Sequence, residues 1–336
     1  MSPDRFASWL IGSGIRADLD GDGFGDLLAY GSIPGRDKQQ RPHIFWGGPR
    51  GLDARTPPTP IQAPVTNRLA SHRTVAGDFN GDGAADVAMS SPHGDDDGGA
   101  DLAVLYGPFS RAAVPARHTI QPSPTGEELW RMTVDRVDGR RPTGLVVYEG
   151  DDGEQTAGWL LTAGPDGLSK QGRRLNEGMA AAFGDFDGDG ARDVAVGDDG
   201  GRNNEPGFET EPPSVDKTLT IYYGDGRQAV FKGIAGPAVS GDFDGDGHDD
   251  LAFGGVVPSW NLTSYIPARI FWGGSDGLRA GENVDGVGRA APLAAGDYDG
   301  DGDDELAFAH RDDDLKIVIT DGKRALASFD TLSLGL

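Results

Sequence analysis

The stretch GDFDGDGARDVAVG at residues 184–197 decides the fold, because its pattern recurs along the chain. Four other segments carry the same pattern: 17–30, 77–90, 241–254 and 296–309. Each copy is followed further along by a run of β-forming residues that ends in glycine, such as HIFWGG from residue 43 and RIFWGG from residue 269. Self-similarity at a nearly fixed period is typical of repeat architectures.

A sixth copy lacks the acidic signature. Residues 132–150 (MTVDRVDGRRPTGLVVYEG) lie where a copy is due, and GWLLTAGPDGL follows at 158–168. The first acid of each copy lies at 18, 78, 135, 185, 242 and 297, so the steps are 60, 57, 50, 57 and 55 residues. Six copies therefore account for the whole chain, which we predict to be a single repeat domain over residues 1–336.

Each copy reads as four short strands. In the second copy, residues 74–79 and 86–90 flank the acidic loop as a hairpin, LAVLYG from residue 102 supplies a third strand, and HTIQP at 118–122 supplies a fourth. The chain has 54 Gly and 22 Pro in 336 residues, too many for long helices. This pattern predicts an all-β fold, a β-propeller of six four-stranded antiparallel blades.

Composition excludes several classes of protein. The 30 Lys and Arg against 54 Asp and Glu give a net charge of −24, which disfavours a nucleic-acid surface built from clustered cations. With no Cys, no disulfide and no thiolate metal site can form. The stretch MSPDRFASWLIGSG lacks the pattern of a secretory signal, and no apolar run approaches the ~20 residues of a membrane span, so we expect no membrane insertion.

The units resemble FG-GAP repeats, also called VCBS repeats, which build the β-propeller of integrin α chains and occur in many bacterial extracellular proteins. The resemblance covers nearly all of the chain and five of its six loops. Propellers of that family generally have seven blades. Either this chain forms a six-bladed ring, or one blade has lost its recognisable pattern, or a missing segment completes the ring. FASWLI (6–11) is placed to pair with LASFDTL (326–332) and close it.

The acidic loops follow the pattern D-x-[DN]-G-D-G-x-x-[DE], with positions numbered from the first Asp. Side chains at positions 1, 3 and 5 converge, glycines at 4 and 6 permit the turn, and such a set of hard oxygen ligands suits Ca²⁺ better than Mg²⁺. The resemblance, together with the EF-hand loop, implies that a position-7 carbonyl and the position-9 acid complete the shell. The alternative is a set of polar turns without metal. The candidate ligands of the five calcium sites are Asp18, Asp20, Asp22, Asp26; Asp78, Asn80, Asp82, Asp86; Asp185, Asp187, Asp189, Asp193; Asp242, Asp244, Asp246, Asp250; and Asp297, Asp299, Asp301, Glu305.

We expect these ions to be structural. Metal bound only by the folded protein stabilises it, so chelation should lower the melting temperature. The third copy, which begins at Asp135, has lost the acids at positions 3 and 5, and its arginines would repel a cation, so it is predicted to hold no metal. Loops of this type suit places where Ca²⁺ is abundant, which favours an extracellular or cell-surface location.

No recognisable enzyme motif is present, and the six His are scattered singly. We therefore favour a non-enzymatic, monomeric binding or adhesion module for a protein or glycan, and assign no catalytic residue. The family resemblance places the acidic hairpins on one face, so the binding face would be the opposite one, built by loops 31–42, 90–101, 197–217 and 254–268.

Trp260 and Tyr265 are either anchors for a ligand or covers for a blade edge. The competing hypothesis is a propeller enzyme of the lyase, cyclase or hydrolase type with its site at the axis.

One aromatic group per blade recurs at the end of the third strand, and we interpret these side chains as packing between blades. They are Phe45, Trp46, Tyr106, Tyr222, Tyr223, Phe271 and Trp272.

Overall fold

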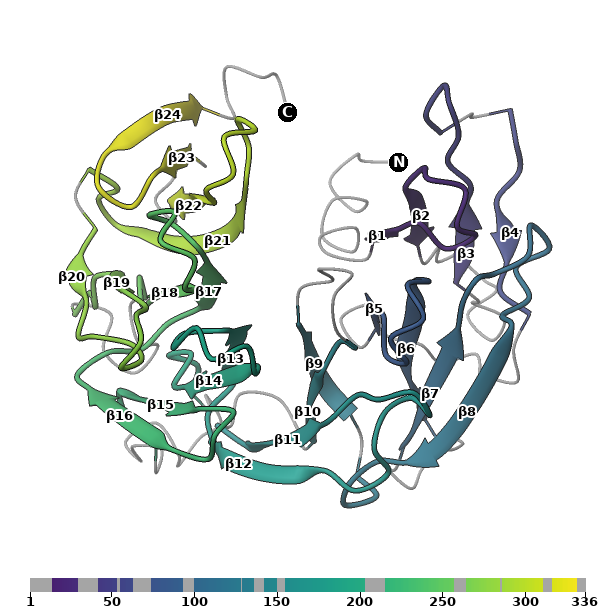
Figure 1. Ribbon diagram of the computed structural model, residues 1–336, viewed down its shortest axis with the longest axis horizontal. Coiled ribbons are helices and arrows are strands. Elements are labelled where there is room, and N and C mark those ends of the chain that lie inside the picture. The colour runs from purple at the N-terminus through teal and green to yellow at the C-terminus, as the bar shows by residue number, and fades with distance from the viewer. Residues whose placement is uncertain are drawn as a thin grey trace, which may run out of the picture. The chain divides into compact units, whose positions relative to one another are not determined.

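The computed structural model describes the chain except for residues 1–13, 30–41, 53–54, 63–73, 93–99, 128, 136–141, 150–154, 203–214, 257–263, 285, 311–315 and 331–336. In the described part all regular structure is β, as Figure 1 shows. Among these residues no helix has the length and apolar character needed to cross a bilayer.

The described strands form six four-stranded antiparallel sheets, and each sheet uses four strands that are consecutive in the chain. The first three sheets, here called blades 1 to 3, contain β1 (Gly14–Ala17), β2 (Asp26–Ala29), β3 (His43–Phe45), β4 (Thr59–Pro60); β5 (Thr74–Gly77), β6 (Asp86–Pro92), β7 (Ala100–Tyr106), β8 (Arg117–Pro122); and β9 (Leu129–Val134), β10 (Leu145–Glu149), β11 (Ala157–Leu161), β12 (Arg173–Glu177).

Blades 4 to 6 have the same meander order. They contain β13 (Ala180–Gly184), β14 (Asp193–Gly197), β15 (Thr218–Tyr222), β16 (Gln228–Lys232); β17 (Ala238–Gly241), β18 (Asp250–Phe253), β19 (Arg269–Phe271), β20 (Glu282–Asn283); and β21 (Ala290–Gly296), β22 (Glu305–His310), β23 (Lys316–Thr320), β24 (Ala325–Asp330).

The predicted all-β propeller fold with six blades is confirmed. The copy without acidic residues is a complete blade, blade 3. The proposed ring closure by residues 6–11 lies outside the described residues, whereas Ala325–Asp330 of the C-terminal segment forms the fourth strand of blade 6. By contacts the chain divides into two units, residues 1–151 with 159–174 and residues 152–158 with 175–336.

Burial explains the order of strands within a blade. The second strands are short runs of small apolar residues buried on both faces, as in DVAVG of β14, where every residue is buried. The fourth strands alternate, as in QAVFK of β16, where exposed and half-buried residues follow one another. Strands covered on both faces read as continuous apolar runs, whereas an edge with one wet face alternates. The second strand is therefore interior and the fourth is the outer edge.

Alternate residues of one strand pack against different neighbouring blades. In β6, Val87 and Met89 belong to the cluster shared with blade 1, whereas Ala88 belongs to the cluster shared with blade 3. In β18, Phe253 packs with blade 4 and Ala252 with blade 6. Within each unit the first strands also lie beside one another, β1 by β5 and β5 by β9, and then β13 by β17 and β17 by β21. Face-to-face packing of sheets is therefore the core of each unit.

Candidate metal loops and blade contacts

Each acidic loop joins the first strand of a blade to the second, so all five occupy the same place in their blades. The glycines at positions 4 and 6 have positive φ in every one of these loops, as at Gly188 (67°) and Gly190 (86°). A side chain is disfavoured in this backbone region, and glycine removes that cost. The predicted turn geometry is confirmed.

The position-1 carboxylate accepts hydrogen bonds from the amides of the turn. Asp18 accepts from Gly21 N–H at 2.9 Å and from Gly23 N–H at 2.8 Å. Asp78 repeats this with Gly81 at 2.7 Å and Gly83 at 3.0 Å. These bonds hold a carboxylate at the centre of the loop and fix its orientation.

Positions 3 and 5 continue the same winding. The position-5 carboxylate accepts from the position-7 amide in all five loops, for example Asp246 from His248 N–H at 2.9 Å. Asp189 N–H donates to Asp187 at 3.2 Å, and Asp301 N–H donates to Asp299 at 3.2 Å. The loop backbone thereby turns successive carboxylates inward.

The position-9 acid also joins the loop to the residues that follow the third strand of its blade. In the loop of blade 4, Asp193 accepts from Phe186 N–H at 2.8 Å with one oxygen and from Gly224 N–H at 2.8 Å with the other. The same pair of bonds recurs at three other loops, and Glu305 makes the first of the two. Burial raises the pKa of Asp86, Asp193 and Asp250 from 3.8 to about 7, although the amide hydrogen bonds oppose it.

In four loops the side chains approach closely enough to share one cation. Three carboxylate oxygens lie within 4.8 Å of one another in each of four groups: Asp18, Asp20, Asp22; Asp185, Asp187, Asp193; Asp242, Asp244, Asp246; and Asp297, Asp299, Glu305. In blade 1, Oδ1 of Asp20 is buried and has no hydrogen-bond partner, as a metal ligand would. Loop 78–86 differs, because the Asn80 side chain donates to Asp82 at 2.8 Å.

Comparison with known proteins agrees with this repeat. The family described as FG-GAP-like repeat matches residues 18–89, a range that contains two of the acidic loops. The chain is a β-propeller, and its residues 18–89 match the FG-GAP-like repeat. No curated protein matches the sequence.

Several solved structures are similar to this propeller at low sequence identity. BBS1N in complex with ARL6DN, soaked with lead, is 12% identical with a TM-score of 0.50, over 95% of this chain and 82% of that one. The exotype rhamnogalacturonan lyase YesX is 14% identical with a TM-score of 0.48, over 95% and 65%. The β-propeller domain of the Trilobed protease from Pyrococcus furiosus is 13% identical with a TM-score of 0.44, over 94% and 85%.

Arginines of the propeller lie against two of the acidic loops. Arg227 Nη2 lies 2.5 Å from the Asp187 carboxylate, and Arg111, which follows the third strand of blade 2, pairs with Asp20 and Asp22 of blade 1. Each guanidinium also lies over an aromatic ring, Trp46 at 5.0 Å for Arg111. Positive charge thus already reaches the loops of blades 1 and 4, which sequence reasoning did not anticipate.

Neighbouring blades are joined at position 1 of the loops. Asp185 N–H donates to the Asp249 carboxylate at 2.7 Å, and Asp249 N–H donates back to the Asp185 carbonyl at 3.0 Å. Asp242 and Asp304 repeat this two-bond contact one blade further on. The residue concerned is at position 8, which the sequence pattern leaves as x, so the pattern contained no signal for its role.

Blades 2 and 3 use Thr143 for the same purpose. Its Oγ1 accepts from Asp78 N–H at 2.9 Å, and its own N–H donates to the Asp78 carbonyl at 2.6 Å. The blade that has lost its acidic loop therefore keeps the contact with its neighbour. Asp135, the first residue of that former loop, is buried.

The aromatics after the third strands touch the turn between the third and fourth strands of the next blade. Tyr223 Oη accepts from Leu278 N–H at 2.9 Å, and Tyr106 lies against Gly167. Packing between blades is confirmed for the buried members of the set, which are Trp46, Tyr106, Tyr223 and Phe271. The interpretation is wrong for Phe45, which points outward and is 37% exposed because it occupies the wet face of its strand.

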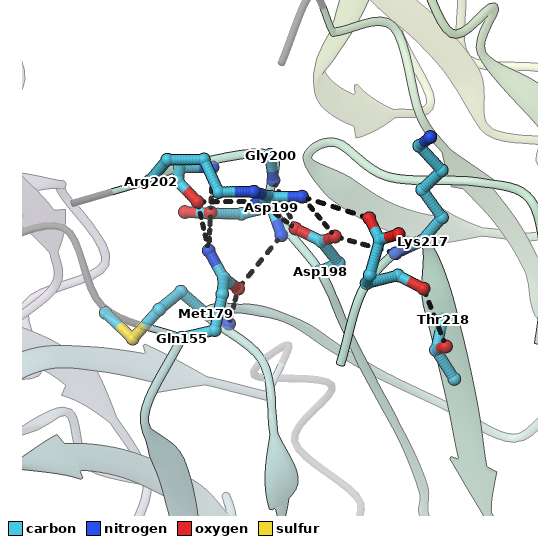
Figure 2. Close-up of polar contacts among 10 residues, drawn as sticks. Gln155, Met179, Asp198, Asp199, Gly200, Arg202, Lys217 and Thr218 are labelled. Carbon is cyan, nitrogen blue, oxygen red and sulfur yellow. Dashed lines mark hydrogen bonds and ion pairs between the residues drawn. The ribbon is translucent and has the colours of Figure 1, made fainter. Parts of the chain in front are cut away.

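The opposite end of blade 4 carries a buried ion pair, drawn in Figure 2. The two terminal guanidinium nitrogens of Arg202, Nη1 and Nη2, donate to the carboxylate of Asp198 at 2.9 and 3.0 Å, and the two side chains are 5% and 0% exposed. Asp198 also accepts from Lys217 N–H at 2.8 Å. This contact joins the two chain segments on either side of residues 203–214.

Gln155 extends the network. Its Nε2 donates to Asp199 at 2.6 Å and to the Gly201 carbonyl at 3.0 Å, and its Oε1 accepts from Met179 N–H at 3.1 Å, as Figure 2 shows. The segment after β14 is thus fixed to the residues just before β11, which in turn bond the residue just before β13.

Other predicted residues have mostly structural contacts. The hydroxyl of Tyr265 donates to the carbonyls of Gly288 and Ala290, both at 3.1 Å, so this side chain covers a blade edge. The His248 ring lies 3.0 Å from Asp246 and packs against Gly188 of the preceding blade. Trp260 lies outside the described residues, as do most residues of the four long loops.

Proposed function

We propose that the FG-GAP propeller binds Ca²⁺ in its five acidic hairpins and that these ions stabilise a module that binds a protein or glycan outside the cell. The observation that carries the calcium part is the inward winding of the carboxylates in one orientation, with Oδ1 of Asp20 buried and without a partner. Leaving such an oxygen buried without a ligand costs free energy.

The donor set fits calcium. The loops offer carboxylates, one amide oxygen and backbone carbonyls, which are the hard oxygen ligands that Ca²⁺ takes in a flexible shell of six to eight. The ion would supply the positive charge that offsets crowded carboxylates. The residues of the chain do the rest, since the turn amides orient the position-1 acid and the position-9 acid holds the loop on the third strand.

Thermal unfolding tests the calcium part. Protein freed of metal with EDTA should melt at a lower temperature than protein in millimolar CaCl₂. Each site adds about 2.7 kcal/mol to the free energy of unfolding when free calcium is at about 100 times the dissociation constant of that site. Asp242→Asn should reduce this gain, whereas Asp166→Asn, an exposed acid outside the loops, should leave it unchanged. Equal midpoints with EDTA and with calcium would overturn the proposal.

The third copy offers an internal comparison. We propose that it holds no ion, so calcium stoichiometry by titration calorimetry or metal analysis should approach five. Mg²⁺ should compete poorly, because it demands a tighter octahedral shell. A stoichiometry of six would contradict the assignment of blade 3.

The proposed role in binding a protein or glycan is supported by the contacts that anchor one long loop to blade 4. The buried pair of Asp198 and Arg202, with Lys217, fixes the residues flanking 203–214 on blade 4. Binding residues lie disproportionately on loops that a rigid scaffold positions. Pull-down from extracellular fractions and glycan arrays, with calcium and with EDTA, test this role. Capture that is lost when 203–214 is replaced by a short Gly-Ser linker supports it, and capture indifferent to this exchange contradicts it.

A further inference from the structure

We propose that a pocket between blades 5 and 6 binds a neutral pyranose sugar. The cavity has a volume of about 560 Å³, within the usual range for small-molecule sites of roughly 300–1,000 Å³. Its walls come from Ile270 and Trp272 at the end of β19, from β20, and from the turn that joins β23 to β24. This is the end of the blades that carries the acidic hairpins, so the pocket is distinct from the loop face discussed above.

A short turn leaves the space. The connections between third and fourth strands span residues 107–116 in blade 2, 162–172 in blade 3 and 272–281 in blade 5, but only 321–324 in blade 6. In blade 5 the long connection places Leu278 against Tyr223 of blade 4. The short turn of blade 6 has no residue that could cover Trp272 in the same way.

The result is visible in the exposure of the aromatics. Trp46, Tyr106 and Tyr223 are 7%, 2% and 4% exposed, whereas Trp272 at the corresponding place is only half-buried. The indole N–H of Trp46 donates to Thr59 Oγ1 at 2.9 Å, but no described residue accepts from the indole N–H of Trp272. An indole with an accessible surface and an available donor is suited to a ligand that has both apolar and hydroxylated parts.

The turn that forms the other wall is held firmly. Asp321 accepts from Lys323 N–H at 2.9 Å and from Arg324 N–H at 2.7 Å, and Thr320 Oγ1 accepts from Gly322 N–H at 3.0 Å. Gly322 touches the indole edge, since a Cβ there would lie 2.9 Å from Trp272 Cη2. The wall is therefore formed before any ligand binds, which lowers the entropy cost of binding.

The rest of the lining is polar and balanced in charge. Glu282, Arg279, Lys323 and Asn283 face the cavity. Asp244, which is also a candidate calcium ligand of the blade 5 loop, lies at its edge on that side. Carboxylates accept, ammonium and guanidinium groups donate, and an amide does both. Such a set can satisfy the several hydroxyls of a sugar, each of which is both donor and acceptor.

Other ligand classes fit less well. A phosphate or nucleic acid would meet two carboxylates here and a protein of net charge −24. A wholly apolar ligand would leave the five polar side chains without partners at the cost of their desolvation. Lys323 Nζ lies 5.5 Å from the centroid of the Trp272 ring, but a cation–π contact at an exposed site is weak, so a sugar can displace it.

The test is an array of neutral mono- and oligosaccharides in calcium buffer, followed by calorimetric titration with the free sugar bound best. The full chain should bind one or more of these probes. Glu282→Ala with Asn283→Ala, both on an exposed edge strand, should weaken binding about tenfold or more, which corresponds to the loss of about 1.4 kcal/mol. Trp272→Phe, which keeps an aromatic ring in the core, should also weaken binding.

Glu127→Gln, an exposed change in blade 2, is the control and should bind as the unaltered protein does. The melting temperature reports whether each variant is folded, and its response to calcium reports the metal loops separately. An array without any bound neutral sugar would overturn the pocket assignment, as would full affinity in the folded double variant. Either result would leave the calcium proposal standing.

Discussion

Arg227 places its guanidinium 2.5 Å from the carboxylate of Asp187, a residue whose side chain is 1% exposed at position 3 of the acidic loop of blade 4. The same arginine lies 4.7 Å from the centroid of the Tyr223 ring and donates to the Asp276 carbonyl of blade 5 at 3.4 Å. One side chain thus touches a candidate metal site and the contact between two blades, so we expect an ion bound in this loop to affect the packing of the two blades.

We expect Arg227→Gln to raise the calcium affinity of this loop about two- to fivefold, since a solvent-screened ion pair competes only weakly with the cation for the Asp187 carboxylate. Calcium titration followed by calorimetry measures the change. Arg117→Gln is the matched control, because Arg117 lies over Tyr106 at 3.8 Å and donates to the Asp166 carbonyl in the same way, but forms no ion pair with a described loop carboxylate. A gain in affinity from both variants would show that competition for Asp187 is not the cause.

Without metal, the free energy of unfolding should fall as the pH rises, and added calcium should oppose this trend. Burial raises the pKa of Asp86, Asp193 and Asp250 from 3.8 to about 7, so the folded state binds more protons than the unfolded state between these values. Without metal, the stability that these groups contribute is present below about pH 4 and is lost as the pH rises through about 7. The metal-free protein should therefore melt higher at pH 5 than at pH 8.

Calcium needs the ionised carboxylates, so the stabilisation that it adds should grow over the same interval. Melting curves with EDTA and with CaCl₂ at several pH values measure both trends. High salt is the control, because it screens the general repulsion of a chain of charge −24 but affects buried groups far less. A metal-free pH trend that vanishes in high salt would contradict the role of the buried acids.

Thr143→Val should destabilise the protein by about 1–3 kcal/mol, because it leaves the buried Asp78 amide without an acceptor. The shape of the side chain is nearly unchanged, so packing is preserved. Thr162→Val, an exposed threonine of the same blade, is expected to have little effect. Denaturant unfolding of both variants gives the difference, and equal stabilities would show that this contact between blades 2 and 3 is dispensable.

Arg202→Met should cost about 3–5 kcal/mol, since it leaves the Asp198 carboxylate buried without its cation. The double variant, Arg202→Met with Asp198→Leu, should recover much of that loss because no buried charge remains. Chemical denaturation of the wild type and the three variants gives the coupling energy. If the double variant were less stable than either single one, the pair would contribute through shape and not through charge.

Much of the architecture was predictable from the sequence, because its signals are local. The strands around the acidic loop of the second copy were predicted at 74–79 and 86–90, and the structure has β5 and β6 at Thr74–Gly77 and Asp86–Pro92. Even blade 3 was recognisable without its acids, since LVVYE keeps the continuous apolar run of an interior strand. Neither prediction needed any information on how the blades contact one another.

Contacts between blades at the acidic loops could not be predicted from local sequence patterns. Their acids and glycines follow a fixed spacing, but the roles of Asp249 and Thr143 depend on a residue of the preceding blade 64 or 65 positions away. Trp46 and Trp272 occupy the same position in two nearly identical sequence segments. Trp46 is buried, whereas Trp272 borders a cavity. The difference comes from the length of a turn in the next blade.

The amino-acid sequence by itself determined the repeat, the strands and the winding of each acidic hairpin, since hydrogen bonds and backbone torsions among a few adjacent residues govern all three. Only the tertiary structure decided which arginine meets which carboxylate, which aromatic stays open, and how one blade holds the next. Those contacts join residues about 40 to 90 positions apart, and stacked sheets alone bring them together.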